Sequence, residues 1–337
     1  VPVINLMVPQ GTLFHLSDYS VSLLGKILCY AICALAMDLI WGYTGILSLG
    51  HGLFFALGGY AMGMYLMRQI GRDGQYQSDM PDFMVFLNWK EFPWHWALSD
   101  SFVFQMAMVV LVPGLLAFVF GYFAFRSRIK GVYFSIITQA LTFAFMLLFF
   151  RNETGFGGNN GFTDFKRILG ITIATPSTRM VLFVITGLVL IGFFVFARWL
   201  VASKFGRVLQ AIRDAESRVM FTGYDPIRYK LTIWVISAVT CGIAGALYVP
   251  QVGIINPGEM RPAASIAMAI WAAVGGRGTL IGPIVGAFFV NGAKSWFTQA
   301  FPEFWLYFLG ALFIAVTLFL PQGIIGLVRR VKKEERP

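Results

Sequence analysis

Apolar runs about as long as a membrane is thick follow one another along most of this chain. A spanning helix needs about 20 mostly apolar residues, because the hydrocarbon layer is roughly 30 Å thick. Seven runs reach or approach that length: Val21–Ile40, Leu53–Met67, Phe102–Phe125, Gly131–Phe150, Met180–Leu200, Leu231–Pro250 and Phe304–Leu320. Ser265–Gln299 is long enough to cross twice if it is split at Gly275–Thr279. We therefore expect nine crossings, two or three of them short.

The composition supports an all-α, polytopic transmembrane bundle that forms one domain over residues 1–337. Hydrophobic residues make up 58% of the chain and charged residues only 12%, whereas soluble domains carry roughly a quarter of charged residues. The net charge of +10 could suggest a nucleic-acid-binding protein. Such proteins cluster Lys and Arg on a solvated face, but here these residues punctuate apolar runs, so we expect a lipid bilayer and no nucleic acid as partner.

The basic residues predict the topology. Fifteen of the 26 fall in three regions that nine crossings place on one side: Arg126–Lys130, Arg198–Lys230 and Arg329–Arg336. By the positive-inside rule that side is cytoplasmic. The cytoplasmic side then holds the segment 201–230 and the tail 321–337 with the C-terminus. The loops 68–101 and 151–179 lie on the opposite, periplasmic side. A chain that begins at Val1, with no Met and no signal-peptide pattern, fits a form without an upstream first helix, so we expect about ten crossings in the full protein.

Glycine-rich segments interrupt two of the apolar stretches, at Trp41–Tyr60 and Gly275–Phe289. Broken helices are tolerated in a bilayer only where the freed backbone faces protein or a water-filled cavity, and in transporters they mark the substrate pathway. Small residues also allow helices to pack closely. Both interpretations remain open.

Polar side chains inside the spans are candidates for the substrate pathway. Four of them recur at helical spacing on one face: Ser135, Thr138, Gln139 and Thr142. A polar stripe is unfavourable against lipid, so it points inward, either to line the pathway or to bond a neighbouring helix. Ser48, His51 and Asn291 are further pathway candidates, and Asp38 and Lys294 are other ionisable candidates within the spans, although Asp38 and His51 lie near a predicted cytoplasmic boundary. Lys26 and Lys294 can extend their ammonium groups toward the membrane surface.

Several signatures of catalysis are absent from the sequence. There is no G-x-x-x-x-G-K-[ST] phosphate-binding loop, and three isolated histidines and three cysteines offer neither a metal site nor a catalytic triad. We expect no enzyme activity, no metal and no cofactor in this chain. The energy for transport would come from another subunit.

The long polar segment Ser203–Leu231 predicts an amphipathic helix. Val208, Ile212, Ala215 and Val219 recur at helical spacing over Arg207–Phe221. Gly223 suits a helix end and Asp225-Pro226 suits a turn. Such a helix could rest in the headgroup layer or fill a groove on a partner.

The string SKFGRVLQAIRDAESRVMFTGYDPIRYKL resembles the coupling segment of permeases in branched-chain amino-acid type ABC importers. GYTGILSLGHGLFFALGGYA, GGRGTLIGPIVGA and LFLPQGIIGL also match that family's pattern, so the resemblance covers essentially the whole chain. Within the family, Gly131–Phe145 and Ser78–Trp96 are most similar to the C-type permease of urea transporters.

The resemblance implies a second homologous permease, two ATPase subunits that bind ATP and Mg, a periplasmic substrate-binding protein and a bacterial inner membrane. It assigns ATPase coupling to one segment, with the residues Arg207, Leu209, Ile212, Arg213, Glu216, Met220 and Gly223. The expected function is ATP-driven import of a small polar solute, with urea as the first candidate. Branched-chain amino acids or short amides are the alternative, and a passive solute channel is the second alternative.

Overall fold

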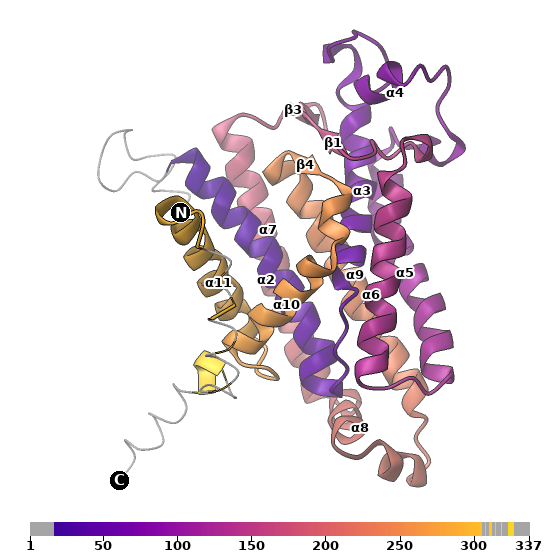
Figure 1. The fold of residues 1–337 in the computed structure, drawn as a ribbon, viewed down its shortest axis with the longest axis vertical. Coiled ribbons are helices and arrows are strands. Elements are labelled where there is room, and N and C mark those ends of the chain that lie inside the picture. The colour runs from indigo at the N-terminus through magenta and orange to yellow at the C-terminus, as the bar shows by residue number, and fades with distance from the viewer. Residues whose placement is uncertain are drawn as a thin grey trace.

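The computed structural model describes residues 17–304 together with residues 307, 310, 311, 314, 318 and 323–326. Long helices dominate this part of the chain: α2 Asp18–Thr44, α3 His51–Arg68, α5 Phe102–Arg126, α6 Val132–Phe150, α7 Pro176–Ala202, α8 Lys204–Phe221, α9 Pro226–Val252, α10 Pro262–Gly275 and α11 Ile281–Ala300 (Figure 1). The predicted all-helical bundle is confirmed.

The short elements lie mainly at one end of the bundle, and α8 lies at the opposite end (Figure 1). The first group comprises α4 Asp82–Phe86, β1 Phe162–Thr163, β2 Arg167–Ile168, β3 Ile171–Thr172 and β4 Ile254–Ile255. The strands form two antiparallel pairs, β1 with β4 and β2 with β3. The 3-10 turns are η1 Gly71–Asp73, η2 Trp94–Trp96, η3 Asn152–Thr154 and η4 Pro257–Met260. We call the two ends of the bundle the α4 end and the α8 end.

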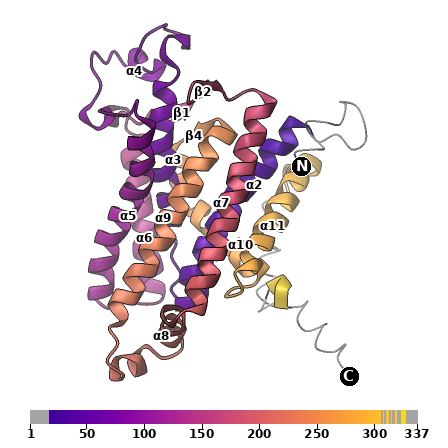
Figure 2. The same ribbon diagram turned by 180° about the vertical axis from the view of Figure 1, so that it is seen from behind.

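The buried centre consists of α2, α3 and α9. In the most apolar window of α2, 72% of the residues are buried, and in that of α9 67%, against 28–33% in α5, α6 and α7. Every residue of α3 except Arg68 is buried. α7 runs along α2 on the rear of the bundle (Figure 2). The outward faces of α5, α6 and α7 therefore form the apolar surface that a bilayer would cover.

Glycines bring α3 and α9 into backbone contact. A Cβ atom added to Gly58 would overlap the carbonyl of Gly242, and one added to Gly245 would overlap the carbonyl of Phe55. Small residues at such a crossing allow the close approach on which helix packing in membranes depends. This contact holds α3 in the centre of the bundle. With 18 residues, α3 is barely long enough to span the bilayer.

We expect the substitution Gly58→Ala to destabilise the bundle by about 1–3 kcal/mol or more, because the new methyl group forces α3 and α9 apart. Gly192→Ala on α7 is the matched control, since a Cβ there meets nothing within 4 Å. Thermal unfolding in detergent measures both. Equal midpoints for the two variants would contradict the close contact.

The helices fall at the predicted crossings, with one correction. α2, α5, α6, α7 and α9 are long and apolar enough to span a membrane. Ser265–Gln299 is split as expected, but α10 has 14 residues and is roughly 21 Å long at 1.5 Å per residue, too short for a 30 Å layer. The predicted double crossing is therefore a short α10 followed by a longer α11. The predicted crossing Phe304–Leu320 and the tail 321–337 lie largely outside the described residues.

The predicted helix interruptions are present. α2 ends where Gly45 adopts a left-handed conformation, φ 74°, and α3 begins only at His51. Between them the stretch 45–50 lies against α6. There the Ser135 hydroxyl donates to the Leu47 carbonyl, and the Leu49 N–H donates to Thr138 Oγ1. The second predicted interruption falls between α10 and α11, where Gly276 and Gly278 adopt positive φ. A further break, which was not predicted, separates α9 from α10 and carries η4. The first turns of α3 and α10 meet inside the bundle, where the Gly52 N–H donates to Ser265 Oγ over 2.9 Å.

Candidate functional site: a charged cavity between α2, α10 and α11

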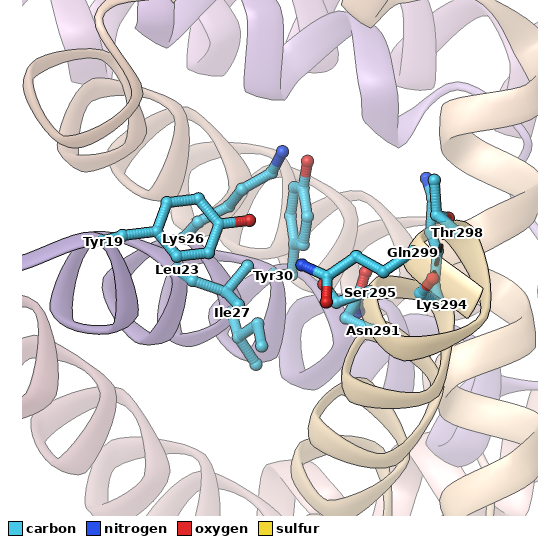
Figure 3. Close-up of a pocket in the computed structure, with 10 residues that line it drawn as sticks. All are labelled: Tyr19, Leu23, Lys26, Ile27, Tyr30, Asn291, Lys294, Ser295, Thr298 and Gln299. Atoms are coloured by element: carbon cyan, nitrogen blue, oxygen red, sulfur yellow. Dashed lines mark hydrogen bonds between the residues drawn. The ribbon is translucent and has the colours of Figure 1, made fainter. Parts of the chain in front are cut away.

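Two connected cavities follow the groove between α2 and α11. The outer one has a volume of about 260 Å³ and extends along the groove to Tyr19 of α2 and Gln299 of α11. Figure 3 shows side chains of α2 and α11 lining it from both sides. The inner one, of about 380 Å³, reaches α10 and the aromatic rings of Phe55 and Trp271. The two cavities share four of their lining residues, Lys26, Tyr30, Asn291 and Lys294. We therefore treat them as one space, the charged cavity.

The inner part of the charged cavity brings groups of opposite charge together. Lys26 comes from α2, Lys294 from α11 and Glu259 from η4. Glu259 accepts a hydrogen bond from the Tyr248 hydroxyl over 3.3 Å. The Lys26 ammonium lies 5.8 Å from the ring of Tyr30 and 5.9 Å from that of Tyr248, close enough for cation–π attraction. A solute that enters therefore meets a carboxylate and two ammonium groups on facing walls.

The turn η4 explains how a carboxylate reaches this depth. Gly253, at φ 82°, ends α9, and the Asn256 side chain then accepts the Gly258 N–H over 2.8 Å. The chain folds inward at Pro257–Met260 before α10 begins. Because this backbone is not part of a continuous helix, it can present Glu259 to the interior of the bundle.

Apolar residues line the remainder of the inner cavity. Ala263, Ala267 and Met268 of α10 lie on one side and Val290 of α11 on another. Ligand sites combine mostly apolar walls with a few placed polar groups. The cavity is therefore suited to a small molecule with charged or strongly polar ends and a short apolar part.

Of the candidate residues within the spans, the structure places Asn291 and Lys294 at the charged cavity. The Asn291 side-chain amide donates to the Ala287 carbonyl over 2.8 Å, which fixes its orientation on α11. Sequence reasoning missed Glu259, Tyr30 and Tyr248, and treated Lys26 only as a residue that reaches for the membrane surface. The signal for Glu259 was available in the Asn-Pro-Gly-Glu turn at Asn256–Glu259.

Ser48 and His51 lie in the packed interior, away from the described cavities. Both are fully buried. His51 Nε2 shares a 2.7 Å hydrogen bond with Ser237 Oγ, and its ring packs edge-on against Trp234. Ser48 Oγ accepts the Gly50 N–H over 3.1 Å. In this structure both residues stabilise the restart of α3.

The polar stripe of α6 also contacts protein backbone. Ser135 Oγ donates to the Leu47 carbonyl over 2.7 Å, and Thr138 Oγ1 accepts the Leu49 N–H over 3.1 Å. Thr142 Oγ1 donates to the Thr138 carbonyl within α6 over 2.8 Å, and Gln139 is half-buried. None of the four lines the charged cavity. The geometry fits the alternative in which the stripe bonds a neighbouring segment, since the non-helical stretch 45–50 needs partners for its peptide groups.

We expect Thr138→Val to lower stability by about 1–3 kcal/mol, because it leaves the Leu49 N–H buried without an acceptor. Gln139→Leu is the neighbouring control and should change stability by less than about 0.5 kcal/mol. Thermal unfolding and uptake are measured on the same preparation. Unchanged stability with reduced uptake for Thr138→Val would instead support a pathway role.

At the α8 end, the predicted amphipathic helix is present but bent. α8 covers Lys204–Phe221 and is interrupted at Ala215, whose φ of −158° and ψ of 78° are not helical. Leu209, Ile212 and Val219 are buried within this chain. The expectation that Leu209 and Ile212 enter a groove on a partner needs correction, because the bundle itself already covers them.

Other coupling candidates are also tied to the chain itself. Glu216 forms ion pairs with Lys130, at 2.7 Å, and with Lys230. Burial raises the pKa of Glu216, but its bonds with the two lysines together lower the pKa by more, so it lies below its ordinary value. Arg213 donates to the Gly42 carbonyl over 2.9 Å. These residues attach α8 to α2 and α9.

The part of α8 that remains free for a partner is its far end. Phe221 is 91% exposed, and Met220 and Tyr224 are also exposed. Gly223, at φ 84°, turns the chain directly after them, and the predicted coupling residue Arg207 is exposed as well. Three neighbouring large side chains on a polar surface form a small apolar patch, which we call the α8 tip.

A chain of contacts joins α8 to the charged cavity. Arg213 bonds α2 at Gly42, and a Cβ on Gly42 would lie 2.7 Å from the Gly278 nitrogen. Asp38 of α2 accepts the N–H groups of Gly278 and Leu280 over 2.6 and 3.1 Å. Those residues belong to the turn between α10 and α11, so contacts connect α8 through α2 to the two helices that line the cavity.

The described residues contain no candidate metal cluster. Within residues 17–304 and the later described positions, no group of three or more His, Cys, Asp or Glu could hold a metal ion. Cys29, Cys33 and Cys241 are buried free thiols, as expected for packing residues.

Comparison with known proteins identifies the family. Residues 19–317 match the family model described as "Branched-chain amino acid transport system / permease component". The chain is 24% identical to the high-affinity branched-chain amino acid transport system permease protein LivM of Salmonella typhimurium, over 94% of this chain and 72% of that protein. It is also 24% identical to the BraD permease of Pseudomonas aeruginosa, over 88% and 91%. A ribose import permease of Bacillus subtilis is 27% identical over 41% of this chain and 42% of that protein.

No solved structure matches this chain with significance. The family model covers most of the chain and describes a transport component, in agreement with the multi-pass helical bundle and the absence of a catalytic motif from the sequence. This chain is a non-catalytic membrane permease and belongs to the branched-chain amino acid transport system permease family.

Proposed function

We propose that this chain is the permease subunit of an ATP-driven importer and that its charged cavity is part of the substrate path. The observation that carries the proposal is the meeting of Glu259 with Lys26 and Lys294 inside an apolar bundle. Ionisable groups at membrane depth are costly and mark substrate or ion pathways. In this proposal the solute enters past Tyr19 and Gln299, from the α4 end of the bundle.

The preferred substrate is a zwitterionic amino acid with a short aliphatic side chain. Its ammonium would face Glu259, and its carboxylate would face Lys26 and Lys294. Its side chain would contact Ala267, Met268 and Val290. The named relatives that cover most of the chain are branched-chain amino acid permeases, which supports the same class. Urea, the first candidate from the sequence, and short amides could use the same polar groups but have no need of paired opposite charges.

The membrane orientation follows from charge. The basic residues of Arg126–Lys130 and of α8 lie at one end of the bundle (Figure 1), and the positive-inside rule makes that end cytoplasmic. In the bacterial inner membrane the α4 end then faces the periplasm, where a substrate-binding protein delivers the solute. The α8 tip faces the cytoplasm and contacts one of two ATPase subunits, which bind ATP and Mg.

The contacts on the page suggest how movement is transmitted. A displacement of the α8 tip by an ATPase subunit would be carried by Arg213 to the end of α2. The Asp38 bonds would carry it to the turn before α11. Packed elements change between discrete arrangements, so α10 and α11 would alternately open and close the charged cavity. A second, homologous permease would complete the path.

Uptake into vesicles reconstituted with the partner subunits and the cognate binding protein tests this function. Leucine, urea and acetamide are supplied separately, with and without ATP. ATP-dependent uptake of leucine, with little uptake of the other two, is the expected result. Uptake of urea alone would favour the earlier candidate, and equal uptake without ATP would favour a passive channel.

A further inference from the structure

A second cavity, unconnected with the charged one, lies in the half of the bundle nearer the α4 end. It has a volume of about 450 Å³, within the range of small-molecule sites, and we call it the α5–α6 slot. Its walls are apolar: α3 contributes Leu57, Ala61 and Met64, α5 contributes Met108 and Val112, and α6 contributes Phe149. A short loop at Trp94–Leu98 lies over its α4 end.

Helices α5 and α6 are in contact near the α8 end, and both line the slot toward the α4 end. At the α8 end they are joined by a short loop, and the rings of Phe125 and Phe134 stack with their centroids 5.2 Å apart. Toward the α4 end the cavity separates Met108 and Val112 of α5 from Phe149 of α6. The two helices form a wedge with α3 as its floor.

The slot opens on the side of the molecule that a bilayer covers. Val112, in the middle of α5, lines the slot and is 38% exposed. The neighbouring residues Leu111 and Leu115 on α5 are exposed too. Trp94 and Leu98 stand exposed at the rim, and exposed Trp is typical of the membrane–water boundary. An occupant can therefore enter sideways from the membrane.

Three residues that line this otherwise apolar space carry polar atoms without partners. Among the described residues, Tyr60 Oη, Gln105 Oε1 and His95 Nε2 are buried and have no hydrogen-bond partner. Tyr60 and Gln105 are only 2% and 1% exposed, and all three residues line the slot. Buried polar atoms in proteins nearly always have partners, so three orphans around one cavity indicate a missing occupant that hydrogen-bonds.

The chemistry of that occupant can be read from the three atoms. Gln105 Oε1 accepts hydrogen bonds, and the Tyr60 hydroxyl can also donate. Burial lowers the pKa of His95, and its backbone hydrogen bond with Thr154 opposes that shift only in part. A neutral imidazole has one acceptor nitrogen, and the unpartnered Nε2 is available for that role. Among the described residues, no Lys or Arg lines the slot. The site therefore suits a donor head group, an ester carbonyl and a hydrocarbon chain, and because its described residues offer no cation, the phosphate between head group and esters has to stay at the rim of the slot.

We propose that the α5–α6 slot binds one phospholipid from the leaflet at the α4 end, with an N–H-bearing ammonium head group such as that of phosphatidylethanolamine. The ammonium donates to Gln105 Oε1 and His95 Nε2. The Tyr60 hydroxyl donates to an ester carbonyl, and one acyl chain fills the wedge beside α3. The lipid would hold α5 and α6 at a fixed separation next to the buried centre.

Native mass spectrometry of the complete transporter, released from nanodiscs that contain equal amounts of phosphatidylethanolamine and phosphatidylcholine with identical chains, tests this site. Phosphatidylcholine carries three N-methyl groups and no N–H donor. We expect one lipid to remain bound, with about a tenfold preference for phosphatidylethanolamine, the factor that corresponds to one or two hydrogen bonds.

Two variants locate the binding. Gln105→Leu keeps the slot apolar and should abolish the head-group preference while an acyl chain still binds. Ala61→Phe should fill the slot and remove the retained lipid from an assembled complex. If Ala61→Phe fails to assemble, the loss of preference in Gln105→Leu decides alone. Equal retention of both lipids by the wild type, an unchanged preference in Gln105→Leu, or density for water or a partner's side chain in the slot would overturn the proposal.

Discussion

Replacement of Glu259 with Gln should lower leucine uptake by about 30-fold or more while the transporter remains assembled. The substitution preserves shape and leaves an oxygen to accept the Tyr248 hydroxyl, but removes the negative charge. A bound ammonium would then face Lys26 and Lys294 without compensation. Loss of one partner of a buried, hydrogen-bonded charge pair costs about 2–5 kcal/mol, and each 1.4 kcal/mol is a factor of ten.

The same variant separates the substrate classes. Urea carries no net charge, and the amide oxygen that Glu259→Gln introduces could still accept its N–H groups, so urea uptake should fall by less than about tenfold. Glu153→Gln is the control, because Glu153 is exposed at the α4 end, where it forms an ion pair with Arg151 at 3.4 Å. Wild-type leucine uptake by an intact Glu259→Gln complex would remove the charged cavity from the substrate path.

The sequence carries most of the information on the helices. Apolar runs report burial or lipid contact directly, so α2, α5, α6, α7 and α9 could be placed from length and composition. The interruption after Thr44 was also predictable, because the sequence is rich in glycine there. Gly45 adopts a φ of 74°, which is unfavourable for other residues. Two or three short crossings were also expected, and α10 is one of them, but the length of an apolar run does not say how deep in the bundle its helix begins.

The candidate site was harder to predict because it depends on contacts between distant segments. Glu259 is informative only beside Lys26 and Lys294, and nothing local in the sequence brings α2, η4 and α11 together. The stripe Ser135, Thr138 and Thr142 was recognisable as inward-facing. Its partners, the peptide groups of the stretch 45–50, could be found only once that stretch was seen to lie against α6.

The same limit applies to α8. Its amphipathic pattern predicts a helix with one covered face. The pattern is the same whether a partner protein or the protein's own bundle covers that face, so the sequence cannot distinguish the two. The buried positions of Leu209 and Ile212 assign the face to the bundle. We therefore propose that the docking residues are those that the bundle leaves exposed, at the α8 tip.

Phe221→Asp should therefore uncouple ATP hydrolysis from uptake. Phe221 is 91% exposed in the isolated chain, and an aromatic side chain at the centre of an interface contributes about 2 kcal/mol or more in many complexes. A carboxylate at that position would also be buried without a partner, which is strongly unfavourable. We expect association with the ATPase subunit to weaken by about 30-fold or more, with loss of ATP-dependent uptake and unchanged membrane insertion.

Phe86→Asp provides the matched control. Phe86 is 71% exposed but belongs to α4 at the opposite end of the bundle (Figure 1), so its replacement should leave ATPase binding unaltered. Leu209→Asp should also reduce uptake, but for another reason. It should destabilise the bundle that covers Leu209, and thermal unfolding detects this loss of stability. Co-purification of the ATPase subunits measures docking directly. Normal co-purification and normal uptake in the Phe221→Asp variant would show that the ATPase contacts another part of the α8 end, and the exposed Arg207 would then be the next residue to replace.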